Sequence, residues 1–239
     1  MSEAAPAPTR CGFVAILGAP NVGKSTLLNR LVGTKVSIVS PKVQTTRRRV
    51  LGITIHDGAQ LVFVDTPGIF DPKKRLDRAM VDAALAGGSD SDVVVLVLDA
   101  KRGLDGRSKL VFERLAETNR RRLLVVNKID LVKPHQLLPI IHEANAALAF
   151  EETFLVSAET GDGCEAVLDA LPARVPEGPW LFPEDQLSDL SDRTLAAEIT
   201  REHLFRQLKE ELPYNLTVET EAWATAPDGA EVRIDQTIY

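Results

Sequence analysis

The segment "GAPNVGKST", residues 18–26, has its glycines, lysine and serine at the spacing G-x-x-x-x-G-K-[ST]. Glycines let the backbone curl so that successive N–H groups point at phosphate oxygens, and a helix that starts there adds partial positive charge. Lys24 can then bridge the β- and γ-phosphates of a nucleotide, while the Ser25 hydroxyl binds Mg²⁺. The spacing predicts a phosphate-binding loop of Gly18, Ala19, Pro20, Asn21, Val22, Gly23, Lys24, Ser25 and Thr26.

A second segment, "DTPG" at residues 65–68, is weak when taken alone, because many surface turns contain Asp before Pro-Gly. Its position makes it informative, since it ends an apolar run downstream of the phosphate loop. There the Asp65 carboxylate can hold a water of the Mg²⁺ shell, and the Gly68 N–H can reach the γ-phosphate. We therefore expect a γ-phosphate sensor made of Asp65, Thr66, Pro67, Gly68 and Ile69.

A third segment, "NKID" at residues 127–130, has the chemistry to recognise a base. Asp130 can accept the two adjacent N–H donors of guanine, whereas adenine presents a lone pair that leaves the carboxylate unsatisfied. This pattern favours GTP over ATP. Lys128 can lie along the base and brace the phosphate loop, and Asn127 can tie two loops together. With a backbone N–H for the guanine carbonyl, the predicted base pocket is Asn127, Lys128, Ile129, Asp130, Ser157 and Ala158.

These motifs need a scaffold that brings them together, and the apolar runs supply one. Asp-Gly at residues 57–58, between two β-rich runs, predicts a hairpin. Strands that alternate with helices predict a doubly wound, mostly parallel α/β sheet. The predicted strands are residues 12–18, 50–55, 61–65, 93–99, 123–127 and 153–157, and the predicted helices are 24–31, 107–118, 135–149 and 164–171.

A change in composition marks the C-terminal part of the chain. Prolines recur between residues 172 and 183, which predicts a linker at 173–192. Apolar residues then recur at helical spacing over 194–212, and Pro213 stops the pattern. The remaining residues alternate around "APDG" as in a hairpin. A helix and a hairpin make a thin core, so we expect the chain to stop inside a larger unit.

The composition excludes several classes of protein. A length of 239 residues with 44% hydrophobic content can bury a core, and a net charge of -6 gives no global field for nucleic acid. Any RNA contact must be regional, and we expect no DNA partner. Two distant cysteines, Cys11 and Cys164, form no disulfide framework, as suits a reducing cytosol. The longest aliphatic run, residues 93–98, is too short for a membrane span, and the first 11 residues predict a disordered lead without an export signal.

Taken together, the motifs resemble those of translation-factor-class GTPases and, more specifically, the Era family of ribosome-assembly GTPases. The resemblance rests on "GAPNVGKSTLLN", "SPKVQTTRRRVLGI", "VDTPGI", "VVNKIDL", "VSA" and "KEELPYNLTVE", of which "QTTR" with "ELPY" is the most specific combination. It implies a P-loop G domain at residues 12–172 and a partial KH-like RNA-binding domain at 193–239. The implied partners are GTP, GDP and small-subunit rRNA. The implied protein is a cytoplasmic monomer, with peripheral association with the inner face of the cell membrane left open.

The resemblance also implies the first switch, around Gln44, Thr45 and Thr46. Thr46 would bind Mg²⁺ through its hydroxyl and sense the γ-phosphate through its N–H, which makes Lys24, Thr46 and Gly68 the implied catalytic residues. The basic residues 47–49 would meet RNA or GTP, although a solvated basic stretch explains them equally well.

Ile69 stands where related GTPases carry a glutamine that orients the attacking water, and isoleucine can make no such hydrogen bond. The resemblance therefore implies slow hydrolysis with another means of organising the water. Some members of the family use K⁺ beside the phosphates, with an asparagine of the phosphate loop as ligand. Asn21 matches that asparagine, so K⁺ is a candidate cofactor beside Mg²⁺, although Asn21 can equally serve only to shape the loop.

Two alternatives stay open from the sequence. One is a related GTPase that acts in tRNA modification or large-subunit assembly, and the other is a nucleotide-gated binding protein with negligible hydrolysis. KH domains clamp nucleic acid with a G-x-x-G loop, and none occurs after Tyr214.

Overall fold

The larger part of the molecule is built on a six-stranded sheet with the strand order β2-β3-β1-β4-β5-β6. The computed structural model describes residues 9–40, 49–65, 91–208, 212, 216–226 and 231–239. All neighbouring strands of this sheet are parallel except β2 and β3, which confirms the predicted α/β class. The strands are β1 (Arg10–Leu17), β2 (Val50–His56), β3 (Ala59–Asp65), β4 (Val93–Asp99), β5 (Arg121–Asn127) and β6 (Glu152–Val156).

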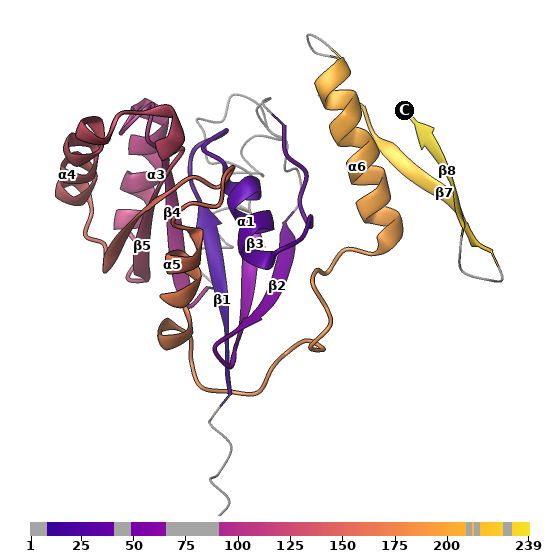
Figure 1. Ribbon diagram of the computed structural model, residues 1–239, viewed down its shortest axis with the longest axis horizontal. Coiled ribbons are helices and arrows are strands. Elements are labelled where there is room, and N and C mark those ends of the chain that lie inside the picture. The colour runs from indigo at the N-terminus through magenta and orange to yellow at the C-terminus, as the bar shows by residue number, and fades with distance from the viewer. Residues whose placement is uncertain (1–8, 41–48, 66–90, 209–211, 213–215, 227–230) are drawn as a thin grey trace, which may run out of the picture.

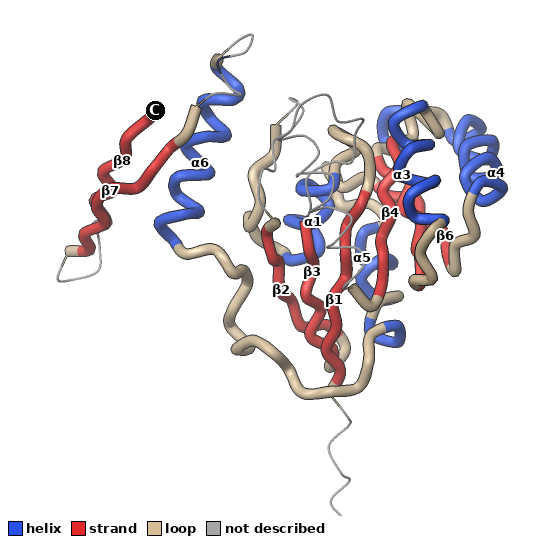
Figure 2. Tube along the Cα trace, turned by 180° about the vertical axis from the view of Figure 1, so that it is seen from behind, coloured by secondary structure: helices blue, strands red, loops and turns tan. Residues whose placement is uncertain are grey.

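Helices cover both faces of this sheet. Figures 1 and 2 show α1 (Lys24–Val32) and α5 (Cys164–Asp169) on one face, and α3 (Gly106–Ala116) and α4 (Leu137–Ala147) on the other. Because successive strand residues point to opposite faces, β1 supplies Val14 and Ile16 to the core under α1 and Ala15 and Leu17 to the core under α3. The sheet is therefore buried on both sides, as a doubly wound fold requires.

The hairpin of β2 and β3 turns at Asp57 and Gly58, as predicted. Their backbone φ angles are 46° and 75°, which is the conformation of a tight two-residue turn, and His56 pairs with Ala59 across it. The hairpin is the antiparallel edge of an otherwise parallel sheet. Its two free ends adjoin the predicted switch segments, because residues 41–48 precede β2 and residues 66–90 follow β3.

A smaller part lies beyond the β2 edge of the sheet, where α6 (Asp192–Gln207) packs on the hairpin of β7 (Val218–Thr225) and β8 (Val232–Ile238) (Figure 1). Ala197 and Phe205 of α6 bury against Leu216 and Val218. The helix begins where Ser191 caps it by accepting from the Thr194 N–H.

The predicted extent of this helix, to residue 212, was wrong. The helix ends at Gln207, because Leu208 takes an extended backbone (φ -77°, ψ 151°) and packs beside the cluster around Phe205. The apolar residues keep their helical spacing beyond Gln207, so the sequence pattern alone does not indicate where the helix ends.

Residues 173–192, which connect the two parts, are ordered along the sheet. We call residues 176–190 the strap. Trp180 and Phe182 of the strap pack on an apolar patch of β1, β2 and β3. The Ile53 N–H of β2 donates to Leu187 O (2.9 Å), so that the strap continues the sheet beyond β2. No helix of the described residues has the length and apolar character needed to cross a membrane.

Candidate nucleotide site

The phosphate loop joins the carboxyl end of β1 to the start of α1. Gly23 (φ 98°) precedes the helix in a left-handed conformation, and Gly18 (φ 152°) lies against β4. A Cβ atom at Gly23 would lie 2.3 Å from Asn127 Nδ2, and one at Gly18 would lie 2.5 Å from Val97 O. Both glycines are therefore required by close approach as well as by backbone conformation. The curled loop at a helix N-terminus is the geometry that binds phosphate.

Lys24 lies beneath this loop with 7% of its surface exposed. Its Nζ donates to Gly18 O (3.2 Å) and Ala19 O (3.1 Å). Burial lowers the pKa of Lys24 to about 8, and the negative charge of Asp65 partly offsets this effect. A buried cation inside a ring of backbone groups has a strong electrostatic attraction for a phosphate anion.

Ser25 and Asp65, the two described residues predicted to hold Mg²⁺, lie together. Ser25 Oγ donates to Asp65 Oδ2 over 2.7 Å, and Asp65 is completely buried at the end of β3. A hydroxyl and a carboxylate are hard oxygen donors of the type that Mg²⁺ prefers, so the residues fit this ion. Thr46, the third predicted ligand, lies outside the described residues.

Ser37 also reaches this carboxylate, which the sequence did not predict. Its Oγ donates to Asp65 Oδ2 over 2.8 Å, and the residue is 3% exposed. The Asn29 side chain of α1 holds Ser37 in place, because Asn29 Oδ1 accepts from the Ser37 N–H (2.9 Å) and Nδ2 donates to Ser37 O (2.8 Å). Two hydroxyls therefore orient one carboxylate oxygen.

Asn127 ends β5 and connects three loops. Its Nδ2 donates to Val22 O (2.8 Å), and its Oδ1 accepts from the N–H groups of Lys128 (2.8 Å) and Ala158 (2.9 Å). The side chain is buried, so these hydrogen bonds are made away from water. They join the phosphate loop to both segments that are predicted to bind the base.

Lys128 makes a second connection between the loops. The residue has a left-handed backbone (φ 66°), and its Nζ donates to Asn21 O (2.6 Å) and Asp99 Oδ2 (2.7 Å). Asp99, at the end of β4, is 3% exposed and was not predicted as a site residue. The signal that could have identified it is an acidic residue that ends an apolar strand, as Asp65 does.

The remaining base-pocket residues follow β5 and β6. Asp130 lies in the short helix η1 (Ile129–Leu131) and is exposed, and the described residues give its carboxylate no hydrogen bond or ion pair. Ser157 and Ala158 are buried, but the Ala158 N–H donates to Asn127 Oδ1 rather than standing free for a guanine carbonyl. Thr66, Pro67, Gly68 and Ile69 lie outside the described residues.

The strand order, the phosphate loop and the base loops at the same edge of the sheet define a GTPase domain of the P-loop class. Residues 13–128 match the family described as 50S ribosome-binding GTPase. Across the whole chain, the protein is 58% identical to GTPase Era of Sinorhizobium medicae (strain WSM419), with 100% of this chain and 76% of the relative covered. It is 56% identical to GTPase Era of Afipia carboxidovorans, with 100% of this chain and 77% of the relative covered.

Solved structures agree with these relatives. A crystal structure of Era in complex with MgGDPNP and nucleotides 1506–1542 of 16S ribosomal RNA superposes with a TM-score of 0.88 at 39% identity, covering 96% of this chain and 78% of that one. The chain belongs to the Era family of GTPases, which confirms the resemblance found in its motifs. Its reaction is the hydrolysis of GTP to GDP and phosphate.

Proposed function

We propose that the described loops form the GTP site of a Mg²⁺-dependent switch that assists assembly of the small ribosomal subunit. The observation that carries the proposal is the contact between motifs distant in sequence, in which Asn127 holds Val22 and Lys128 holds Asn21. In the proposed site Lys24 binds the β- and γ-phosphates, and Asp130 accepts the two N–H groups of guanine. Thr46 and Gly68, on the switch segments, would sense the γ-phosphate.

Mg²⁺ would be held by Ser25 directly and by Asp65 through a water. The 2.7 Å contact between Ser25 Oγ and Asp65 Oδ2 supports this assignment, because Mg²⁺ keeps several waters and takes few protein ligands. The ion would neutralise charge that develops on the transferred phosphoryl group. This chain's own contribution is to position the phosphates, with Lys24 fixed below the loop.

Phosphate release under multiple turnover tests the hydrolytic part of this proposal. We expect release with GTP and Mg²⁺, little release with ATP, and none from Lys24→Ala, which loses the buried cation. Chelation of Mg²⁺ should abolish the GTP signal. A wild-type rate equal to the blank, with GTP still bound, would instead identify a nucleotide-gated binding protein.

Small-subunit rRNA is the proposed partner. The support comes from whole-chain similarity to proteins named GTPase Era and from a related structure that contains 16S ribosomal RNA. The family described as 50S ribosome-binding GTPase matches only residues 13–128, so this match gives no information about a partner of α6, β7 and β8. A pull-down with the chain bound to a GTP analogue tests this partner. We expect an RNA with the sequence of nucleotides 1506–1542 of 16S rRNA to be retained better than a large-subunit RNA of equal length. Equal or reversed retention would contradict this partner.

A potassium ion at Asn21 is a further part of the proposal. The Asn21 backbone is left-handed (φ 63°), a conformation that asparagine tolerates, so loop shape alone also accounts for this residue. Asn21→Gly separates the two roles, because glycine keeps the backbone conformation and removes the side-chain oxygen. If Asn21 binds K⁺, replacement of Na⁺ by K⁺ accelerates the wild type and leaves the variant unchanged. Equal acceleration of both proteins would remove Asn21 as the ligand.

We propose a monomer that acts in the cytoplasm. The buried, unpaired thiols of Cys11 and Cys164 suit a reducing compartment. Sedimentation of the purified chain and fractionation of cells test the two statements. A dimer, or recovery with membranes at physiological salt, would contradict them.

A further inference from the structure

Glu202 is a buried carboxylate that links the two parts of the molecule. It lies on α6 and is 2% exposed. Its Oε2 lies 2.5 Å from Lys35 Nζ and accepts from the Val39 N–H over 3.4 Å, while its Oε1 accepts from Arg206 of the same helix over 2.6 Å. Arg206 in turn donates to Val39 O over 3.2 Å. Lys35 and Val39 belong to the loop after α1, so these contacts cross from the second part to the first.

The same loop reaches the nucleotide site from its other side. Ser37, midway between Lys35 and Val39, donates to Asp65 Oδ2 over 2.8 Å. Residues 35–39 are thus held at Glu202 by their ends and at Asp65 by their middle residue. Three polar contacts therefore connect Glu202 to Asp65 through residues 35–39.

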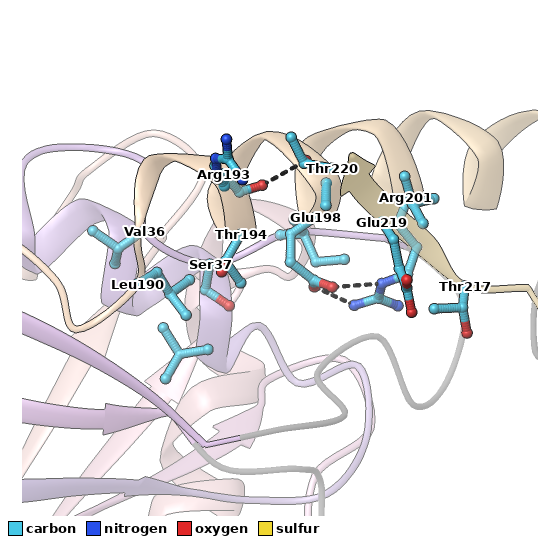
Figure 3. Close-up of a pocket in the computed structure, with 14 residues that line it drawn as sticks. Val36, Ser37, Leu190, Arg193, Thr194, Glu198, Arg201, Thr217, Glu219 and Thr220 are labelled. Atoms are coloured by element: carbon cyan, nitrogen blue, oxygen red, sulfur yellow. Dashed lines mark hydrogen bonds and ion pairs between the residues drawn. The ribbon is translucent and has the colours of Figure 1, made fainter. Parts of the chain in front are cut away.

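A cavity of about 360 Å³ lies where the loop after α1 meets α6 and β7 (Figure 3). Val36 and Ser37 line one side of it, while Thr194, Glu198 and Arg201 of α6 line the other. Val36 packs in the core under α1, and the cavity lies between this part of the loop and α6. The polar contacts of Glu202 reach the loop on either side of it, at Lys35 and Val39. The buried Glu202 carboxylate has to be compensated by charge and hydrogen bonds, and Lys35 and Val39 supply part of that compensation.

We propose that Glu202 is a positioning residue for the nucleotide site, which holds residues 35–39 so that Ser37 orients the Asp65 carboxylate for Mg²⁺. The inference rests on the proposed role of Asp65 at the Mg²⁺ water shell. Loss of the Ser37 hydrogen bond leaves the carboxylate less well oriented, which weakens Mg²⁺ binding and thereby speeds GDP release at low Mg²⁺. Because Glu202 acts only through the loop, its effect depends on the presence of Ser37.

A double-mutant cycle in the Mg²⁺ dependence of GDP release tests this coupling. We call the midpoint the Mg²⁺ concentration at which the slowing of GDP release by Mg²⁺ is half complete. In Ser37→Ala this midpoint should rise about tenfold, as expected for the loss of one hydrogen bond to a charged acceptor. Glu202→Gln should raise it about threefold to tenfold, and the double variant should match Ser37→Ala within about twofold. At saturating Mg²⁺ all variants should release GDP as the wild type does, whereas a loosened fold would speed release at every concentration.

Two further variants make the result decisive. Glu198→Gln is the matched control, because Glu198 lies one turn earlier on α6 and pairs with Arg201 of the same helix. It should leave the midpoint within about twofold of the wild type. Lys35→Met removes the charge that pairs with Glu202. Because the Lys35 side chain is 42% exposed, this variant should fold, so it tests the contact if Glu202→Gln does not fold. It should raise the midpoint in the same direction.

The possible outcomes separate the inference from the proposed function. Additive effects of Ser37→Ala and Glu202→Gln, or normal midpoints in Glu202→Gln and Lys35→Met, would overturn the role of Glu202 while the GTP site stands. A wild type whose GDP release does not depend on Mg²⁺ would overturn the assignment of Asp65, and with it the inference.

Discussion

The side-chain amide of Asn127 donates a 2.8 Å hydrogen bond to the carbonyl oxygen of Val22, across 105 positions of sequence. This bond attaches the phosphate loop, which follows β1, to the base loop, which follows β5. The two strands are not neighbours, because β4 lies between them, so side chains have to join their loops, and Lys128 adds a second bond, to Asn21 O. A nucleotide that spans both loops would find them already connected, which reduces the ordering cost of binding.

Asn127→Ala should weaken GDP binding at least tenfold, because the phosphate and base loops lose their common side chain. The loss of hydrogen bonds to a residue that is 2% exposed should also lower the free energy of unfolding by about 1–3 kcal/mol. Titration with GDP and urea denaturation measure the two effects. Asn145→Ala is the control, since Asn145 makes its hydrogen bonds to Ile141 and Thr153 on the exposed side of α4. Equal GDP affinity in both variants would refute the bridging role.

Gly23→Ala should abolish tight GDP binding, because the added Cβ would lie 2.3 Å from Asn127 Nδ2 in a backbone at φ 98°. Gly33→Ala is a matched control, since Gly33 ends α1 at φ 82° with nothing within 4 Å of an added Cβ. Both variants should lose about 1 kcal/mol of stability from backbone strain. Only the first should lose GDP affinity in a titration. A similar loss in both would mean that strain, rather than the contact with Asn127, controls the loop.

Gln60→Leu should loosen the strap from the sheet. Gln60 is fully buried in β3, where its Oε1 accepts from the N–H groups of Leu181 (2.8 Å) and Phe182 (3.0 Å), and its Nε2 donates to Phe182 O (2.8 Å). Leucine fills the space but leaves these backbone groups unpaired, so the free energy of unfolding should fall by about 2–3 kcal/mol in urea denaturation.

Limited proteolysis gives an independent measurement on the strap. The strap of Gln60→Leu should be cut faster than that of Gln186→Leu, because Gln186 makes its hydrogen bond to Ser188 within the strap itself. Equal stability and equal cleavage of the two variants would show that Gln60 does not anchor the strap.

Glu151→Gln should destabilise the fold slightly at neutral pH and not at acid pH. The hydrogen bond from Arg121 (2.8 Å) lowers the pKa of Glu151, and Arg174 (3.0 Å) adds to this effect against the opposing effect of burial. A carboxyl group with a lowered pKa in the folded state stabilises above its unfolded pKa, and this contribution is lost as pH falls through the folded value. The pairs are exposed, so the effect should stay below about 1 kcal/mol.

Urea denaturation at pH 7 and at about pH 3 measures this difference. Glu143→Gln, which removes an exposed pair with Lys109 at 3.9 Å, should show little change at either pH. A Glu151→Gln deficit that persists undiminished at the lower pH would show that packing, and not charge, is responsible.

Much of the fold and of the site could be predicted, because the responsible signals are local in the sequence. The phosphate loop has to combine Gly18, Gly23 and Lys24 within a few residues, and Asp57-Gly58 specifies a turn on its own. Strands buried on both faces are continuous apolar runs, such as Val93–Asp99, and are easily recognised.

The features that were missed depend on tertiary contacts. Ser37 stands in an apolar run with no motif around it, and its contact with Asp65 depends on a loop that Asn29 holds through hydrogen bonds to Ser37. The contact of Glu202 with Val39 spans 163 positions. The sequence of α6 predicts an amphipathic helix, and nothing in its pattern distinguishes Glu202 from the other charged residues. The prolines of the strap predict a linker. The pairing of Leu187 with β2 depends on the free edge of the sheet, and no local sequence pattern indicates where that edge lies.

The central claim is that one site grips phosphates beside Lys24 and reads guanine with Asp130, and nucleotide selectivity tests it most directly. Binding of GDP, xanthosine diphosphate and ADP should be measured for the wild type and for Asp130→Asn. The wild type should prefer GDP to both others by at least about a hundredfold, because only guanine offers the carboxylate two donors. Asp130→Asn should lose that preference and favour xanthosine diphosphate, whose additional carbonyl can accept from the amide. Unaltered preference for GDP in the variant would contradict the account.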